Sequence, residues 1–212
     1  MRRTAIKICG ITIKEQAVEI SRQPIDAMGF VIYNKSPRFI QPADVKAIVN
    51  QLPPFIKRVG VLVNESIESV STIHKTAGLD LIQLSGDESP DYCAELTAKG
   101  ISWLKTIRVK DQSSLANLSF FENGWILLDA WSKEEFGGTG KSFDWQIISE
   151  GIDRSRIVLA GGITPENAAI AIKTVQPYAI DVSSGVENSP GNKSIEKVKK
   201  LIKATEDVWE MD

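Results

Sequence analysis

Short apolar runs alternate with longer amphipathic segments along almost the whole chain. Most of the runs are rich in valine and isoleucine, which is typical of strands buried on both faces of a parallel sheet. They lie at Ala5–Cys9, Asp26–Ile32, Arg58–Val63, Leu79–Leu84, Trp103–Val109, Trp125–Ala130, Ile157–Ala160 and Ala179–Val182. The pattern therefore predicts eight short strands.

The amphipathic segments between the runs carry recognisable helix start signals. Ser66 and the Ser89-Pro90 pair each precede such a segment. Thr12, with Glu15 three residues later, forms a capping-box pattern. The predicted helices are Ile13–Arg22, Ala43–Leu52, Ile67–Ala77, Asp91–Lys99, Asp111–Phe121, Phe143–Ser149, Asn167–Val175 and Ser194–Thr205.

Eight strand-then-helix units predict an α/β fold of the (β/α)8 TIM-barrel type, with residues 1–212 as a single domain. An open doubly wound sheet is the alternative. Such sheets more often carry a glycine-rich phosphate loop after the first strand. Here the first run ends in Cys9-Gly10-Ile11-Thr12, without that motif, and this favours the barrel.

Composition narrows the class of protein. Of 212 residues, 42% are hydrophobic and 25% charged, and the net charge is -2, which argues against disorder and against a nucleic-acid partner. No apolar run is long enough to cross a membrane, and the N-terminus does not resemble a signal peptide. The scattered Cys9, Cys93 and His74 offer no metal site. We expect a cytoplasmic monomer without a metal or other cofactor.

Strand parity predicts which side chains share the barrel interior. Successive strand residues point to opposite faces, so Lys7 and Cys9 lie opposite Ile6 and Ile8. With the isoleucines and leucines facing the helices, the inward polar residues are Lys7, Cys9, Gln83, Ser85, Asp129, Asp181 and Ser183. Ionisable groups are costly to bury without partners, so this cluster indicates a working site. The alternative is a purely structural ion pair of Lys7 with Asp181 or Asp129.

Two glycine- and serine-containing loops favour a phosphate site. Gly161 and Gly162 follow the seventh run, and Ser183 and Ser184 follow the eighth. In TIM barrels these two loops commonly offer backbone N–H groups to a phosphate. The two segments are much more specific together than either is alone.

Two further loops are candidates for substrate contact. The loop after the second run contains Lys35 and Arg38, of which Arg38 could bind a carboxylate through two hydrogen bonds, although a solvated surface is the common fate of such a pair. The loop Trp131–Ser142 includes Gly138 within a glycine-rich stretch. That composition fits a lid over the substrate, and also a merely disordered loop.

With these segments in place, the chain resembles phosphoribosylanthranilate isomerase. The matching motifs are Lys7–Thr12, Gly29–Val31, Lys35–Arg38, Val59–Val61 with Val63-Asn64, Gln83–Glu88, Leu127–Asp129, Gly137–Gly140, Phe143–Trp145, Leu159–Ile163 and Asp181–Glu187. They run in family order from residue 7 to about 200, and the combination is far more specific than any one motif.

The resemblance implies an Amadori rearrangement of N-(5-phosphoribosyl)anthranilate in tryptophan biosynthesis, without a cofactor. In the family, the aspartate matching Asp129 is the general acid and the cysteine matching Cys9 is the general base. The arginine matching Arg38 holds the anthranilate carboxylate. Backbone and hydroxyl groups at Gly161, Gly162, Ser183 and Ser184 hold the phosphate. We expect Lys7, Gln83, Gly138 and Asp181 to complete the substrate-binding set.

The acid–base chemistry places a demand on the thiol. A thiol acts as a base only when its pKa is lowered towards neutrality, and we expect the neighbouring Lys7 to lower the pKa of Cys9. An inert core cysteine is the alternative for Cys9. It is the expectation for Cys93, which lies inside a predicted helix, while His74 is expected to face solvent.

Two departures from the family pattern leave alternatives open. Ser85 stands where most members have histidine, and Asn34 replaces a usual proline. The first change motivates a catalytically silent sugar-phosphate-binding barrel. The other alternative is a histidine-pathway aminoaldose isomerase, but such enzymes have aspartate at the position of Cys9 and need a second phosphate cradle, which this chain does not offer.

Overall fold

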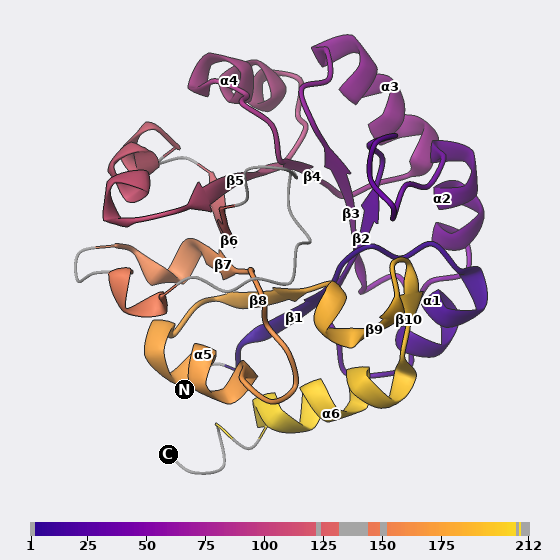
Figure 1. Cartoon of the computed structure of the whole chain (residues 1–212). Helices are drawn as coiled ribbons and strands as arrows, with labels where there is room; N and C mark the ends of the chain where they lie inside the picture. Colours follow the sequence, from indigo (N-terminus) through magenta and orange to yellow (C-terminus); the bar gives the residue numbers. More distant parts are fainter. Residues whose placement is uncertain (1–2, 122–123, 132–143, 149–151, 207, 209–212) are drawn as a thin grey trace.

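A closed barrel of eight parallel strands forms the centre of the molecule (Figure 1). The computed structural model describes residues 3–121, 124–131, 144–148, 152–206 and 208. The strands are β1 (Ala5–Ile8), β2 (Ala27–Val31), β3 (Lys57–Leu62), β4 (Leu81–Leu84), β5 (Trp103–Val109), β6 (Trp125–Ala130), β7 (Ile157–Leu159) and β8 (Ala179–Val182). Each strand pairs with the next, and β8 returns to β1, which confirms the predicted (β/α)8 barrel.

Helices surround the barrel on its outside (Figure 1). The α-helices are α1 (Lys14–Ile20), α2 (Pro42–Val49), α3 (Ile67–Ala77), α4 (Pro90–Ala98), α5 (Ala168–Val175) and α6 (Ile195–Glu206). Short 3-10 segments are η1 (Gln112–Phe121), η2 (Trp145–Ile147), η3 (Arg154–Arg156) and η4 (Ser184–Val186). A hairpin of β9 (Glu187–Ser189) and β10 (Asn192–Lys193) follows η4.

Two of the predicted helices are 3-10 segments instead. At the start of the segment 112–121, Ser114 Oγ accepts from Lys110 N at 3.1 Å and from Asp111 N, and such local bonds compete with an α-helix. In the stretch predicted as Phe143–Ser149, Asp144 accepts from Gln146 N and starts a single 3-10 turn. The ends of that prediction, residues 143 and 149, lie outside the described residues.

The start signals predicted some helix caps correctly and one incorrectly. Ser66 accepts from Ser69 N and Ser89 accepts from Tyr92 N, so both predicted caps are confirmed. The capping box at Thr12 was wrong: its hydroxyl donates to Gly191 O at 2.7 Å, and α1 begins without a side-chain cap. A tertiary hydrogen bond has replaced the local one.

Apolar side chains fill two separate layers, as the strand parity predicts. The outward-facing isoleucines and leucines, such as Ile6, Ile82 and Leu128, pack against the helices and are almost completely buried. A smaller cluster closes the barrel interior and consists of Leu104, Leu127, Val158, Ala160 and Ala179. The inward polar residues at the carboxyl ends of the strands line a pocket there.

No helix in the described part of the chain is both long and apolar enough to cross a membrane.

Candidate active site

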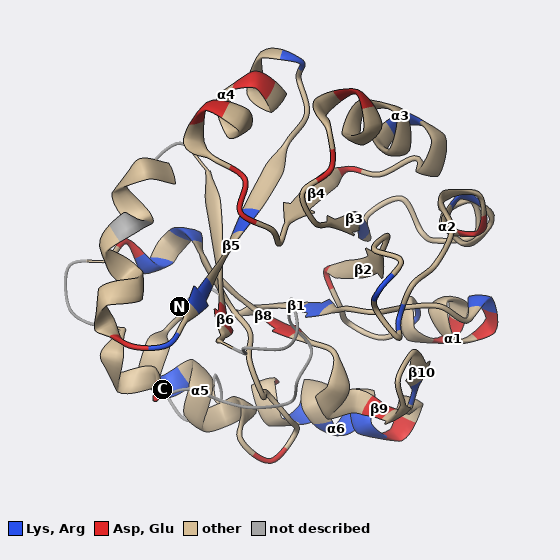
Figure 2. Ribbon diagram, turned by 45° about the horizontal axis from the view of Figure 1, so that its top comes forward, with Lys and Arg blue, Asp and Glu red and all other residues tan. Residues whose placement is uncertain are grey.

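The predicted site residues meet in one pocket at the carboxyl ends of the strands. Its lining includes Cys9, Arg38, Gln83, Asp129, Gly161, Gly162, Asp181, Ser183 and Ser184. Lys7 lies beside this set without lining the pocket, and Gly138, with residues 132–143 of the predicted lid loop, lies outside the described residues. Figure 2 shows acidic residues on β6 and β8 and a basic residue on β1, in the centre of a molecule whose other charges lie mostly on the periphery.

A buried ion pair joins the first and last strands. Lys7 stands opposite Asp181 in the β1–β8 register, and Lys7 Nζ donates to Asp181 Oδ2 at 2.9 Å. Both side chains are buried. The structural ion pair considered as an alternative therefore exists. Asp181 also lines the pocket, and its Oδ1 is buried without a hydrogen-bond partner in the described part of the chain. The protein therefore leaves the hydrogen-bonding capacity of this oxygen unused.

The polar row continues from Lys7 across β4 and β5. Lys7 Nζ also donates to Gln83 Oε1 at 3.0 Å, and Gln83 Nε2 donates to Ser85 Oγ and Thr106 Oγ1. Sequence reasoning missed Thr106, although strand parity from Leu104 would have placed it inside. Ser85, the departure from the family pattern, is buried within this network and bonds to Thr106.

Cys9 occupies the position directly after β1 and faces the pocket. Gly29 of β2 makes room for it, because a Cβ there would lie 2.6 Å from Cys9 Sγ and 3.0 Å from Lys7 Nζ. Burial and the charge of Asp181 raise the pKa of the Cys9 thiol above its ordinary value. Lys7 lowers the pKa of Cys9, as expected, but by less than burial and Asp181 together raise it. The predicted lowering of the Cys9 pKa was therefore wrong, because desolvation of the thiolate outweighs the nearby cation.

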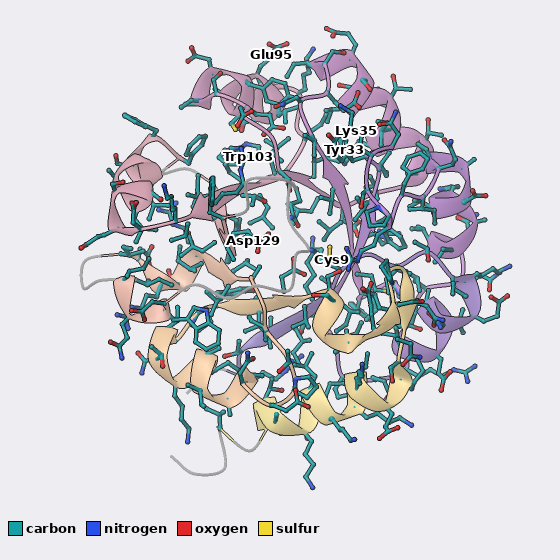
Figure 3. The ribbon with its side chains drawn as sticks, in the orientation of Figure 1. Cys9, Tyr33, Lys35, Glu95, Trp103 and Asp129 are labelled. Carbon is teal, nitrogen blue, oxygen red and sulfur yellow. The ribbon has the colours of Figure 1, made fainter. Side chains whose placement is uncertain are left out.

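Asp129 lies near the end of β6, across the barrel opening from Cys9 (Figure 3). Its Oδ1 accepts from Ala130 N at 2.8 Å. Burial and the neighbouring Asp181 raise the pKa of Asp129 to about 6. A carboxyl group with this pKa holds its proton at much higher pH than a solvated aspartate, which suits a proton donor.

The predicted phosphate loops form one wall of the pocket. Gly161 and Gly162 follow β7, and Ser183 and Ser184 follow β8 at the start of η4. The chain after β7 is fixed by Asn167, whose Nδ2 donates to Gly162 O at 2.9 Å and whose Oδ1 accepts from Thr164 N. This wall combines accessible backbone with two hydroxyl groups.

Arg38 is buried at the pocket wall and is not a solvated surface residue. Its guanidinium donates from Nε and Nη2 to the Glu187 carboxylate, at distances from 2.7 to 3.2 Å. Lys35, in the same loop, is exposed. Sequence reasoning gave no role to Glu187, because nothing in the local pattern shows that an acid at residue 187 meets a base at residue 38.

The remaining candidates lie away from the pocket. Cys93 is a residue of α4 that is buried in the outer core, as expected of an inert cysteine. His74 was predicted to face solvent, but it is half-buried on α3. Among the described residues, no group of three histidine, cysteine, aspartate or glutamate side chains could hold a metal ion.

These features together define a class: a (β/α)8-barrel enzyme with a carboxyl group and a thiol facing one polar pocket, and with a glycine- and serine-lined wall where such barrels bind phosphate. Residues 6–204 match the family model described as N-(5'-phosphoribosyl)anthranilate (PRA) isomerase. The chain belongs to this family and is an isomerase of tryptophan biosynthesis.

Similar proteins cover nearly the full length of the chain. The N-(5'-phosphoribosyl)anthranilate isomerase of Trichlorobacter lovleyi is 47% identical over 199 residues, which cover 93% of this chain and 96% of the relative. The crystal structure of phosphoribosyl anthranilate isomerase from Thermotoga maritima has 39% identity and a TM-score of 0.89, covering 96% of this chain and 99% of that chain. Another structure, with 38% identity, a TM-score of 0.86 and the same coverage, is a phosphoribosyl anthranilate isomerase in complex with reduced 1-(o-carboxyphenylamino)-1-deoxyribulose 5-phosphate.

Proposed function

We propose that the chain, as one domain of residues 1–212, converts N-(5-phosphoribosyl)anthranilate to 1-(2-carboxyphenylamino)-1-deoxyribulose 5-phosphate, with Asp129 as general acid and Cys9 as general base. The observation that carries the proposal is the placement of these two groups on opposite sides of one pocket (Figure 3). The complex of a similar protein with a reduced form of this product supports the choice of substrate.

Asp129 performs the first step. Its carboxyl proton passes to the ring oxygen of the furanose while the bond from that oxygen to C1 breaks. The nitrogen lone pair forms the C1–N double bond, giving an open-chain Schiff base. The pKa of about 6 keeps a proton on Asp129 in a useful fraction of molecules near neutral pH.

Cys9 performs the second step from the other side. Its thiolate takes the proton from C2, the released electron pair forms the C1–C2 double bond of an enolamine, and the pair of the C1–N double bond returns to the nitrogen. Ketonisation then moves the proton held by Cys9 to C1, and the proton of the C2 hydroxyl returns to Asp129, so that both groups regain their starting protonation states. No electron leaves or enters the substrate, so the rearrangement proceeds by proton transfers alone.

The pocket wall supplies the binding groups. We place the anthranilate carboxylate on Arg38 and the phosphate on the wall formed by Gly161, Gly162, Ser183 and Ser184. Asp181 Oδ1, which has no partner in the described structure, accepts from a sugar hydroxyl. Lys7 acts through the two residues that it bonds, Asp181 and Gln83.

Turnover by purified protein in the presence of a chelator tests the proposal. We expect the fluorescence of the anthranilate adduct to be lost at a rate proportional to enzyme concentration. Binding of the reduced product without any turnover would contradict the proposal and would favour the catalytically silent barrel. Turnover of a histidine-pathway aminoaldose in place of the anthranilate substrate would favour the other alternative. Cytoplasmic location and a monomeric state remain predictions from the sequence.

A further inference from the structure

Three charged side chains form a buried cluster beside the pocket, which we call the Arg38–Glu187–Lys193 cluster. Glu187 binds Arg38 through two guanidinium nitrogens, with 2.7 Å between Arg38 Nη2 and Glu187 Oε2. Lys193 Nζ donates to Glu187 Oε1 at 2.6 Å. The exposed fractions of the three side chains are 8%, 4% and 0%, so the charges interact without much solvent screening.

The cluster contains two cations and one carboxylate. Burial alone would raise the pKa of Glu187, but Arg38 and Lys193 hold it below its ordinary value. Glu187 is therefore ionised throughout the neutral range. Of the three residues only Arg38 lines the pocket. The cluster thus presents a net positive charge to the pocket through a single guanidinium.

The surrounding chain fixes both ends of the cluster. Arg38 crosses the backbone just after β1, where a Cβ on Gly10 would lie 2.6 Å from Arg38 Cδ and where φ of +75° also requires glycine. On the other side, Gly191 N donates to Glu187 Oε1 at 3.1 Å, which ties the carboxylate to the turn of the β9–β10 hairpin that carries it. Lys193 Nζ also donates to Ser183 O at 3.2 Å, beside the predicted phosphate wall.

From this geometry we propose that Glu187 is a positioning residue for carboxylate recognition: it holds the Arg38 guanidinium at the pocket wall and thereby sets the preference for an N-aryl group that bears a carboxylate. The inference rests on the proposed function, in which Arg38 binds the anthranilate carboxylate. Glu187 does not line the pocket, so it acts on the ligand through Arg38.

Positioning and simple electrostatics predict opposite effects for Glu187→Gln. The substitution makes the cluster more positive by one charge, so a purely electrostatic role for Glu187 predicts tighter binding of a carboxylate. Loss of the charge-assisted pair lets the guanidinium leave its orientation, so the positioning role predicts weaker binding. Whether Glu187→Gln strengthens or weakens binding of a carboxylate therefore distinguishes the electrostatic role from the positioning role.

The test compares two ligands: the reduced product and its counterpart that lacks the ring carboxylate. For the unmodified protein we expect the carboxylated ligand to bind roughly 30-fold tighter or more, as expected of a buried, charge-assisted contact. In Glu187→Gln we expect this preference to fall by about tenfold, because the orientation of Arg38 is lost, while affinity for the other ligand stays within a few-fold. KM should rise with kcat changing much less.

Glu88→Gln is the matched control. Glu88 is another buried carboxylate paired with a lysine, Lys105, and it does not line the pocket. We expect this variant to keep the preference of the unmodified protein. If Glu187→Gln does not fold, Glu187→Asp, which keeps the charge but withdraws the carboxylate by one methylene, is expected to lose the preference in the same way.

The possible results separate the two proposals. Absence of any carboxylate preference in the unmodified protein would contradict the proposed role of Arg38, and with it the binding scheme. A strong preference in the unmodified protein that persists or grows in Glu187→Gln would overturn the positioning role alone.

Discussion

Ionisation of Asp129 is unfavourable in the folded protein, and its proposed function would explain why such a residue is present. Burial and Asp181 raise its pKa from 3.8 to about 6, which corresponds to about 3 kcal/mol of disfavour for the ionised form in the folded protein. The folded state binds the Asp129 proton more tightly than the unfolded state does, so ionisation of Asp129 lowers the free energy of unfolding. This penalty is fully present above pH 6 and disappears below the pKa of the unfolded chain. The proposed proton donor therefore lowers the stability of the fold at neutral and alkaline pH.

Asp129→Asn should accordingly stabilise the fold in alkaline solution. We expect the free energy of unfolding to rise by up to about 3 kcal/mol at pH 8 and by about half of that at pH 5, because asparagine keeps the acceptor for Ala130 N without a charge. Urea unfolding at the two pH values measures the difference. The exposed Asp91→Asn is the control and should show a much smaller change. An unchanged or lower stability of Asp129→Asn at pH 8 would contradict the account.

At the scale of single residues, strand parity predicted correctly which side chains face the barrel interior. The predicted direction of the shift in the Cys9 pKa was wrong. Parity placed Cys9, Gln83, Asp129 and Asp181 on the inner face, and all four line the pocket. The direction of the Cys9 pKa was wrong because it depends on the extent of burial and on Asp181, whose proximity the local pattern does not specify.

At the scale of elements, the buried ion pair of Lys105 and Glu88 holds the loop after β4. Lys105 of β5 donates to Glu88 Oε2 at 2.8 Å and to Gly86 O at 2.7 Å. Glu88 Oε1 in turn accepts from the backbone N–H groups of Asn64 and Gly86. The pair therefore joins the loops that follow β3 and β4, next to Ser85 of the pocket.

Removing one partner of this pair should cost more than removing both. Lys105→Met leaves the Glu88 charge buried without its cation, and we expect a loss of about 3–5 kcal/mol in the free energy of unfolding. The double variant with Glu88→Gln should recover part of that loss, since the stranded charge is gone. Denaturant unfolding of the single and double variants measures the coupling. A double variant that is less stable than Lys105→Met would contradict the stranded-charge account and would show that the Glu88 carboxylate supports the loop through its bonds from Asn64 N and Gly86 N.

Local signals predicted an element only where no tertiary contact competes with them. The caps at Ser66 and Ser89 act within their own helices and were predicted correctly. Thr12 instead bonds to Gly191, on a hairpin far along the chain. That hairpin was not predicted at all, because strands of two and three residues carry no readable alternation.

At the scale of the whole molecule, counting the strand–helix units was sufficient to predict the barrel. Closure then aligns β1 with β8 and sets Lys7 opposite Asp181, although 174 positions separate them in the sequence. The same closure brings Arg38 to Glu187. Such pairings depend on the register between distant strands and loops. The sequence therefore predicted which residues face the site, but not which residues bond to one another within it.

The central claim is that Cys9 and Asp129 exchange protons with one substrate from opposite sides of the pocket. Its most direct test is the turnover number of Cys9→Ser and Asp129→Asn, with affinity for the reduced product as the control for folding. We expect each variant to lose about 10²–10⁴-fold in kcat while binding that ligand within a few-fold of the unmodified protein. A near-normal turnover number in either variant would contradict the account.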